Sequence, residues 1–242
     1  MFYEKRIKSV PFFQFSELGK VKSLLHVFTS KLTDIACGLD QNSDQDTKKN
    51  PVLKVLGVSE TKTIQIQQIH SHRVCHIGWV TDERPEGDAM VLTSSGVFGI
   101  IKTADCLPVL VIDPFRQKIA MVHAGWRGTL GRILKNSILE MGILGSDPTD
   151  LIVVLGPSIR NCCYKVGLDC RVQFQDQGHD VDRIFLGGNL DLIEANLAQA
   201  EAAGVGQVLD SGMCTCCNPD LFYSHRRDGD KRRMWVLAGF TG

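Results

Sequence analysis

The sequence lacks the features that define several broad classes of protein. No apolar run approaches the roughly 18 residues that a membrane-spanning helix needs. The chain has 27 basic and 27 acidic side chains and a formal net charge of +0, so it has no basic field that would hold a nucleic-acid backbone. Residues Met1–Arg6 contain neither the apolar stretch nor the small-residue cleavage site of a secretory signal. We therefore expect a cytoplasmic protein that binds neither nucleic acid nor membranes.

The nine cysteines are spaced unevenly, unlike the disulfide framework of a small secreted protein. Cys162-Cys163 and Cys216-Cys217 are adjacent pairs, and Cys214 precedes the second pair. In a reducing cytosol such thiols are buried, metal-bound or reactive. A structural zinc site at the second pair is the less favoured interpretation, because that stretch lacks an obvious Cys-x-x-Cys partner.

The chain is long enough to bury a substantial core, and we expect one layered domain over residues 1–242. The polar stretch at residues 40–50 predicts a loop. Apolar runs predict strands at 63–69, 97–102, 109–113, 118–123 and 151–155, with the third and fourth joined as a hairpin. Such a mixture of hairpins and helices is typical of a layered α/β or α+β fold.

Two helices follow from apolar residues at helical spacing. The first covers residues 129–141, with Thr129 as a plausible N-cap. The second covers residues 190–203 and is closed by Gly204.

Polar side chains interrupt three of the strand-like runs at their ends. His70 follows an alternating run, Cys106 lies between two apolar runs, and His123 ends another. Two histidines and one cysteine make a three-ligand set with an open fourth position, which is typical of catalytic zinc. From spacing alone, a nucleophilic Cys-His pair is an equal alternative, Cys106 alone would be a buried apolar residue, and His72 and His76 compete with His70.

The segment after His123 has the composition of an anion site. Gly125 and Gly128 permit close approach of the backbone, and a helix start nearby supplies free N–H groups. Arg127 adds a cation that can bind phosphate through two hydrogen bonds. The alternative is that Trp126 anchors the core and Arg127 forms a surface ion pair.

A later stretch, Phe222–Gly229, combines aromatic and basic groups that suit a pocket wall. Its candidate substrate-binding residues are His225, Arg226 and Arg227. By composition alone, a solvated charged turn is the commoner reading. The segment Gly156–Ile159 could likewise place backbone amides near a ligand.

These motifs together resemble the YfiH family, also called the laccase-domain or multicopper polyphenol oxidase family. The resemblance covers about residues 20–240 and rests on motifs in this order: QIHS, TADCLPVL, HAGWRGT, GPSIRNCCYKVG, CTCCN and RRDG. It implies a single α/β domain with four layers, α/β/β/α. It also implies zinc on His70, Cys106 and His123, and a purine nucleoside phosphorylase that also deaminates adenosine.

The resemblance implies further roles for single residues. The substrates would be phosphate with adenosine, inosine, guanosine or methylthioadenosine, bound by a monomer or homodimer. For the reaction so implied we expect Arg127 and Gly128 to hold phosphate, Asp105 or Asp169 to act near the sugar carbon and the leaving base, and His225 to contact the base or donate the proton. Copper chemistry is disfavoured, because a multicopper centre needs many more histidines than the seven present.

The sequence also departs from the family pattern at presumed substrate contacts. Lys165 stands where relatives carry Glu, and Lys31 stands where an Arg is expected, so the two-pronged guanidinium is lost there. Two alternatives therefore stay open beside the phosphorylase. One is a Cys-dependent hydrolase or amidase acting on peptidoglycan precursors, with Cys106 as nucleophile and His123 as base. The other is a non-catalytic binding protein stabilised by zinc.

Overall fold

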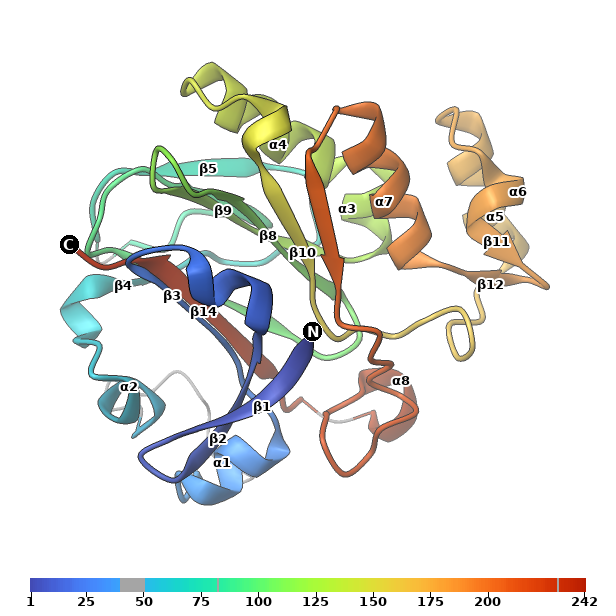
Figure 1. Ribbon diagram of the computed structural model, residues 1–242. Helices are drawn as coiled ribbons and strands as arrows, with labels where there is room; N and C mark the ends of the chain where they lie inside the picture. The colour runs from blue at the N-terminus through green and yellow to red at the C-terminus, as the bar shows by residue number, and fades with distance from the viewer. Residues whose placement is uncertain (40–50, 82, 230) are drawn as a thin grey trace.

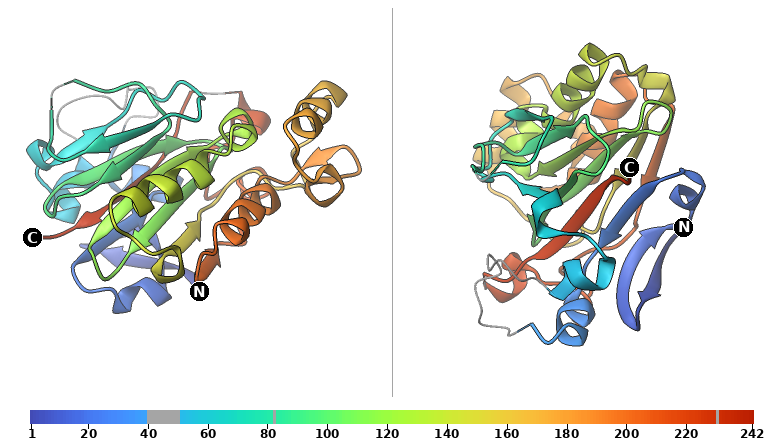
Figure 2. Two further views of the ribbon diagram at one scale, coloured as in Figure 1. Left: turned by 90° about the horizontal axis from the view of Figure 1, so that it is seen from above. Right: turned by 90° about the vertical axis from the view of Figure 1, so that its left-hand side faces the viewer.

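The computed structural model describes residues 1–39, 51–81, 83–229 and 231–242, so the loop predicted at 40–50 lies outside the described residues. Two six-stranded sheets pack face to face, and helices cover the outer face of each. Figure 1 shows the four layers, and the views in Figure 2 show that the helices of the two outer layers lie on opposite sides of the sheets. The expected α/β/β/α sandwich is confirmed.

The first sheet has the strand order β1-β2-β3-β14-β7-β4. Strands β1 and β2 form an N-terminal hairpin, and β14, the last strand of the chain, pairs antiparallel with both β3 and β7. The final pair, β7 and β4, is parallel. The strands are β1 (Phe2–Ile7), β2 (Val10–Phe15), β3 (Leu24–Phe28), β4 (Thr63–Gln65), β7 (Phe98–Thr103) and β14 (Met234–Phe240).

The second sheet has the order β13-β10-β8-β9-β6-β5. The predicted hairpin is confirmed, because β8 and β9 pair antiparallel with Leu107 opposite Ala124. The strands are β5 (Val74–Ile77), β6 (Ala89–Leu92), β8 (Leu107–Asp113), β9 (Lys118–Ala124), β10 (Ile152–Leu155) and β13 (Gln207–Asp210). A small separate ribbon is formed by β11 (Phe185–Leu186) and β12 (Asn189–Leu190).

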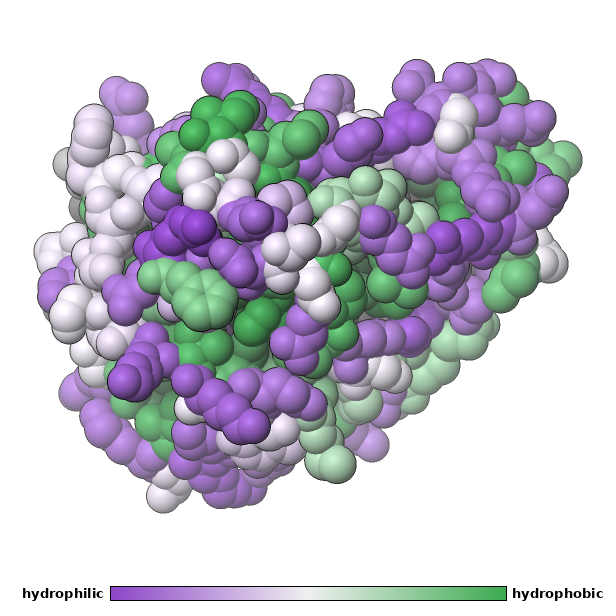
Figure 3. Space-filling model, turned by 45° about the horizontal axis from the view of Figure 1, so that its top comes forward, coloured by the Kyte–Doolittle hydropathy of each residue, from purple (hydrophilic) through white to green (hydrophobic). Residues whose placement is uncertain are grey.

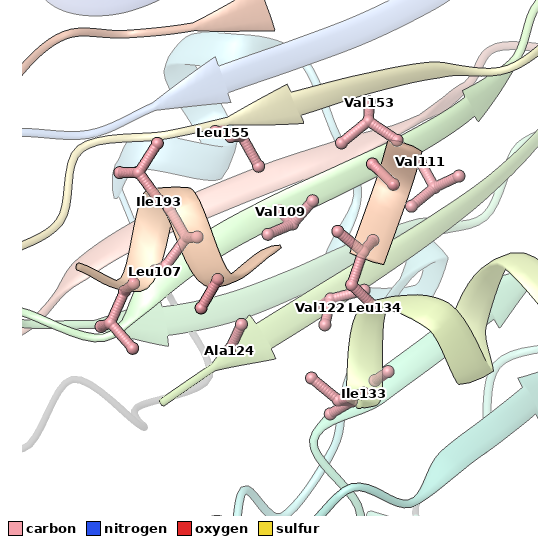
Figure 4. Packing of buried hydrophobic residues seen from close by; sticks show 14 of the residues in the cluster. Leu107, Val109, Val111, Val122, Ala124, Ile133, Leu134, Val153, Leu155 and Ile193 are labelled. Atoms are coloured by element: carbon pink, nitrogen blue, oxygen red, sulfur yellow. The ribbon is translucent and has the colours of Figure 1, made fainter. Parts of the chain in front are cut away.

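Strand β8 shows why its sequence is continuously apolar. Leu107, Val109 and Val111 point to the helices, whereas Leu110 and Ile112 point to the other sheet. A strand in this position is buried on both faces, so it cannot show polar alternation. Figure 4 shows the helix-side packing, with the labelled residues of β8, β9 and β10 facing Leu134 and Ile193.

The helices that cover the second sheet are α3 (Trp126–Leu130), α4 (Ile133–Ile143) and α7 (Leu192–Ala202). The outer face of the first sheet is covered by α1 (Lys31–Ala36) and α2 (Pro51–Leu56). The remaining helices are α5 (Leu168–Asp176), α6 (Val181–Ile184), α8 (His225–Asp228), and the 3₁₀ turns η1 (Ser16–Lys20), η2 (Glu60–Lys62) and η3 (Pro148–Asp150).

The helix predicted over 129–141 is two helices, and the assignment of Thr129 as its N-cap is wrong. Helix α3 begins after Gly125, so Thr129 lies inside it, where its hydroxyl accepts a hydrogen bond from Asn196. The break falls at Arg132, which has a left-handed backbone with φ of 59°. At Gly131, just before the break, a Cβ atom would lie 2.6 Å from the ring of His72, so a larger residue there would require His72 to move.

Other boundaries agree more closely. Helix α7 ends before Gly204, which has a φ of 75° and closes it as expected. The alternating run at 63–69 is a strand only to Gln65, because the chain then leaves the sheet for the loop that bears His70.

The face in Figure 3 is largely hydrophilic, with apolar groups gathered near its top and its centre. Among the described residues, none of the helices combines the length and apolar character needed to cross a membrane.

Candidate active site

Three candidate ligands converge where two strands of the second sheet meet a loop from the first. Cys106 directly precedes β8, and His123 lies near the end of β9, opposite Pro108. Because β8 and β9 are antiparallel, the start of one lies beside the end of the other. His70 reaches the same point from the loop after β4. We call His70, Cys106 and His123 the ligand triad.

The ligand triad is compact enough to bind one metal ion. One ligand atom from each residue lies within 4.8 Å of the other two. The rings of His70 and His123 have centroids 5.0 Å apart and an interplanar angle of 79°, so they meet edge to face and do not stack. The three residues singled out in the sequence are thus brought together, whereas the competitors His72 and His76 do not belong to this group.

Asp88, which the sequence analysis missed, orients two members of the ligand triad. It is fully buried directly before β6, and its Oδ1 lies 2.8 Å from Nδ1 of His123. This leaves Nε2 of His123 for a metal, the arrangement of a carboxylate–histidine–metal relay. The same carboxylate accepts hydrogen bonds from the backbone N–H groups of His70 and Ser71, at 3.0 and 2.5 Å.

The loop that bears His70 is fixed by two further features. The side-chain amide of Gln68 makes two hydrogen bonds of 2.9 Å with the backbone of Lys102 on β7. His70 itself has a positive φ of 58°, an unusual conformation for a residue other than glycine. The hydrogen bonds to Asp88 hold the backbone in that state.

The electrostatics of the ligand triad favour a thiolate. Burial raises the pKa of the Cys106 thiol, but His123 and then His70 outweigh burial and lower it to about 6. Burial lowers the pKa of His123, but the Cys106 thiolate and then Asp88 outweigh burial and raise it to about 9. A thiolate is the form of cysteine that binds metal or attacks an electrophile.

Gly125 keeps the space beside the ligand triad open. A Cβ atom at this position would lie 3.1 Å from Sγ of Cys106 and 3.5 Å from Cδ2 of His70. The donor set of two nitrogens and one sulfur, the buried carboxylate behind it and this missing side chain all fit a bound metal with an open coordination position.

A pocket of about 440 Å³ opens beside the ligand triad, which forms part of its wall. This volume suits a small organic ligand. Three cations also line it, Arg84, Lys102 and Arg233, which we call the pocket cations. The other lining residues are Gln65, Ile66, Gln67, Gln68, Thr103, Ala104 and His225. Of the predicted substrate-binding residues, His225 therefore lies at the pocket.

The two residues predicted to hold phosphate are placed differently. The exposed guanidinium of Arg127 stacks on Trp126, 4.3 Å from the ring centroid, and does not line this pocket. Gly128 packs against the preceding loop, since a Cβ atom there would lie 2.9 Å from the carbonyl oxygen of Ser71. The phosphate roles of Arg127 and Gly128 stay predictions.

Asp105 joins the turn before β8 to a distant loop and to helix α8. Its carboxylate accepts hydrogen bonds from the hydroxyl of Thr215 at 2.6 Å and from the backbone N–H of Arg226 at 2.7 Å. Its φ of 92° lies in a region that residues other than glycine rarely adopt. These contacts suit a residue that positions its neighbour Cys106, while its predicted role toward the sugar stays a prediction.

The remaining predicted contacts lie around helix α8 and bind the chain itself. Arg227 donates to the carbonyl oxygens of Thr215, Cys216 and Phe222. Arg226 donates to the carbonyl oxygen of Lys165 at 2.7 Å, and Lys31 donates to that of Pro219 at 2.8 Å.

The side chain of Lys165 is exposed and does not line the pocket described above. The replacement of the family's Glu by Lys therefore lies outside that pocket wall.

Comparison with known proteins agrees with this fold and these motifs. A family model described as multi-copper polyphenol oxidoreductase laccase matches residues 33–241, so the chain belongs to this family. The crystal structure of the Bacillus licheniformis hypothetical protein YfiH matches with a TM-score of 0.83 and 26% identity, over 98% of each chain. The resemblance inferred from the motifs is confirmed.

Several relatives carry names that state an activity, and two examples follow. A purine nucleoside phosphorylase of Deinococcus radiodurans is 36% identical over 230 residues, which cover 88% of each chain. Adenosine deaminase RL5, from an unknown prokaryotic organism, is 33% identical over 195 residues, which cover 72% of this chain and 73% of that one.

Proposed function

We propose that the protein is a zinc-dependent purine nucleoside phosphorylase, acting as one domain over residues 1–242. The observation that carries the proposal is the ligand triad on the wall of a pocket that also holds the three pocket cations. A metal-binding group and a cationic group facing one cavity suit a substrate with a sugar and a phosphate. The phosphorylase of Deinococcus radiodurans, at 36% identity, supports this choice of reaction.

Zinc is the proposed metal because of the donor set. Zinc accepts histidine nitrogen and cysteine sulfur together, and a catalytic zinc has three protein ligands. Blue-copper centres also use two histidines and one cysteine, but they add a weak axial ligand that is commonly Met. No Met occurs among the described residues that line this pocket. When bound, zinc would supply a Lewis acid for a substrate oxygen.

The chain's own residues account for the rest of the proposed reaction. The pocket cations would hold phosphate beside the anomeric carbon of the ribose, so that a phosphate oxygen forms a bond to that carbon. The bond from this carbon to the purine nitrogen breaks, and its electron pair stays with the base. His225, which lines the pocket, would donate the proton that the leaving base needs. The products are a free purine and ribose 1-phosphate.

Adenosine deamination is proposed as a side activity of the same pocket. The relative named adenosine deaminase supports it, at 33% identity. Free base and ammonia distinguish the two reactions, because phosphorolysis releases the base and deamination releases ammonia.

The test is a phosphate-dependence assay on purified protein of known metal content. Adenosine, inosine, guanosine and methylthioadenosine are each incubated with and without phosphate. Base release that requires phosphate, from protein with zinc on the ligand triad, is the expected result. Zinc-loaded protein that releases no base from any of them would overturn the proposal and favour the non-catalytic alternative.

A Cys-dependent hydrolase is the second candidate, and the contact of Cys106 with His123 favours it. This pair has the arrangement of a nucleophile beside a base, with the base oriented by Asp88. Chelation separates the candidates. A cysteine hydrolase retains its activity after zinc removal and loses it on alkylation of Cys106, whereas the phosphorylase loses its activity when zinc is removed.

A further inference from the structure

A second group of metal-binding side chains lies away from the ligand triad. Cys162, Cys163, Cys214 and Cys217 have sulfur atoms that all lie within 4.8 Å of one another. We call these four residues the thiol cluster. They come from two segments about 50 residues apart in the sequence, so the fold and not the local sequence brings them together.

The strand pairing explains the convergence. Strands β10 and β13 are parallel neighbours, with Leu155 opposite Asp210. The segments that leave their ends therefore leave the same edge of the sheet in the same direction. They remain paired where Ser158 forms a parallel bridge with Cys214, and the first segment then turns back through Cys162 and Cys163.

The sulfur spacings fit tetrahedral metal coordination. The sulfur of Cys217 lies 3.5 Å from that of Cys162 and 3.4 Å from that of Cys163. Four sulfurs at the usual zinc–sulfur distance would be about 3.8 Å apart at the corners of a tetrahedron. A disulfide would need a separation of about 2.05 Å.

The surroundings of Cys214 suit a thiolate, whereas burial and then the hydrogen bond to Cys217 raise the pKa of Cys162 and Cys163. The backbone N–H groups of Arg160 and Cys217 face the sulfur of Cys214 as hydrogen-bond donors. The guanidinium of Arg227 binds the carbonyl oxygens of Thr215 and Cys216, which fixes the turn between the cluster's third and fourth members. Thiolate sulfur selects soft or borderline metals such as zinc over magnesium or calcium.

We propose that the thiol cluster binds one structural zinc ion that ties these two segments together. Each thiol that binds releases its proton to solvent. The clamped segments also hold the turn that bears Cys106, because Thr215 and Ile159 donate to the side chain and backbone of Asp105, at 2.6 and 2.9 Å. Zinc at the cluster would thus support the shape of the active site without touching substrate.

The test counts zinc in full-length protein that has lost the other site. In a His70→Ala/His123→Ala variant, one zinc per chain should remain after dialysis under reducing conditions. Adding Cys217→Ser to this double variant should remove the remaining zinc. If the variant with Cys217→Ser folds poorly, Cys162→Ser tests the same ion, because Cys162 is exposed. Cys37→Ser is the matched control, because this partly buried thiol at the end of α1 does not belong to the cluster and should leave the zinc in place.

Cobalt gives a second readout that does not depend on catalysis. The double variant loaded with cobalt should show an intense thiolate-to-cobalt charge-transfer band, and Cys217→Ser should weaken it. A double variant that binds no zinc would overturn the proposal. So would a disulfide between Cys217 and Cys162 or Cys163 in protein alkylated at lysis. Because zinc is counted in a variant that lacks both histidines of the ligand triad, the result does not depend on whether the protein is a phosphorylase.

Discussion

Oδ1 of Asp88 lies 2.8 Å from Nδ1 of His123, and the same carboxylate binds the backbone of the loop that bears His70. One buried side chain therefore sets the positions of two members of the ligand triad. Burial raises the pKa of Asp88, but the hydrogen bonds from His123 and Ser71 outweigh burial and lower it, so the carboxylate is kept ionised. Its negative charge makes the His123 ring a stronger metal ligand.

Asp88→Asn is expected to lower zinc affinity about 10- to 100-fold and to lower activity with it. The amide retains the shape of the side chain but loses the charge and one acceptor. Competition with a chromophoric chelator measures the affinity. Asp113→Asn is the matched control, because that carboxylate is equally buried and also binds backbone N–H groups, but at the β8–β9 turn. Equal zinc affinities in the two variants would contradict the role given to Asp88.

Gly125→Ala is expected to lower metal content and activity with little loss of overall stability. The new methyl group would lie 3.1 Å from the sulfur of Cys106 and displace it, whereas the N-cap backbone has a φ of −71° that alanine adopts easily. Gly142→Ala in α4 is the control, since its Cβ meets nothing within 4 Å and should stabilise the helix by up to about 1 kcal/mol. Metal analysis and thermal unfolding of both variants check the expectation.

The acid stability of the fold is expected to depend on His26 in β3. Burial first, and then the charge of Lys5, lower its pKa from 6.5 to about 4. Its Nε2 accepts a hydrogen bond from the backbone N–H of Phe15, which requires the neutral ring. The unfolded chain takes up this proton at a higher pH than the folded chain. The contribution of neutral His26 is therefore complete above pH 6.5 and is lost as pH falls toward about 4.

Between pH 6.5 and about 4, the loss of neutral His26 should lower the free energy of unfolding by up to about 3 kcal/mol, and His26→Gln should abolish this part of the decrease. Urea titration at the two pH values measures it. The amide oxygen can still accept from Phe15, but it does not titrate. His76→Gln serves as the comparison, because His76 is a surface residue that pairs with Glu140. If both variants keep the full acid slope, another group controls it.

The ligand triad was predictable from the sequence because each member interrupts an apolar run at a strand end. Asp88 was not, because a Glu-Gly-Asp stretch before a four-residue strand has the composition of a turn. The pocket cations were missed for a similar reason. A single Lys or Arg within or beside a strand normally marks a solvated face, whereas Lys102 lines the pocket and its Nζ lies over the ring of Trp235, 5.5 Å from the centroid.

In the fold, too, some elements follow from local sequence patterns and others depend on contacts between distant segments. The β8–β9 hairpin and helix α7 follow from local patterns, and both are present. The glycine beside the break between α3 and α4 matches a long-range contact, because the ring of His72, 59 residues earlier, packs where a side chain of Gly131 would lie. The thiol cluster likewise depends on the parallel pairing of β10 and β13, which no short motif encodes.

The sequence motif and the pocket point to different cations as partners of the proposed phosphate. The motif around Gly125 assigns phosphate to Arg127, whereas the structure places Arg127 on Trp126 and Lys102 on the pocket wall. A charged hydrogen bond to phosphate contributes roughly 1.5–3 kcal/mol, or about 10- to 100-fold in affinity. Lys102→Met should therefore raise the KM for phosphate at least about tenfold, and Arg127→Ala should change it less than about twofold.

Lys102→Arg completes the series, because it retains the positive charge and should recover most of the phosphate affinity. The two hydrogen bonds between Lys102 and Gln68 use only the backbone of Lys102. The loop that bears His70 should therefore keep its position whether residue 102 is Lys, Met or Arg. Initial rates at varied phosphate and saturating nucleoside measure the KM in each variant. A large rise in the KM for phosphate in Arg127→Ala, with no change in Lys102→Met, would show that phosphate binds at the start of α3 and not at Lys102.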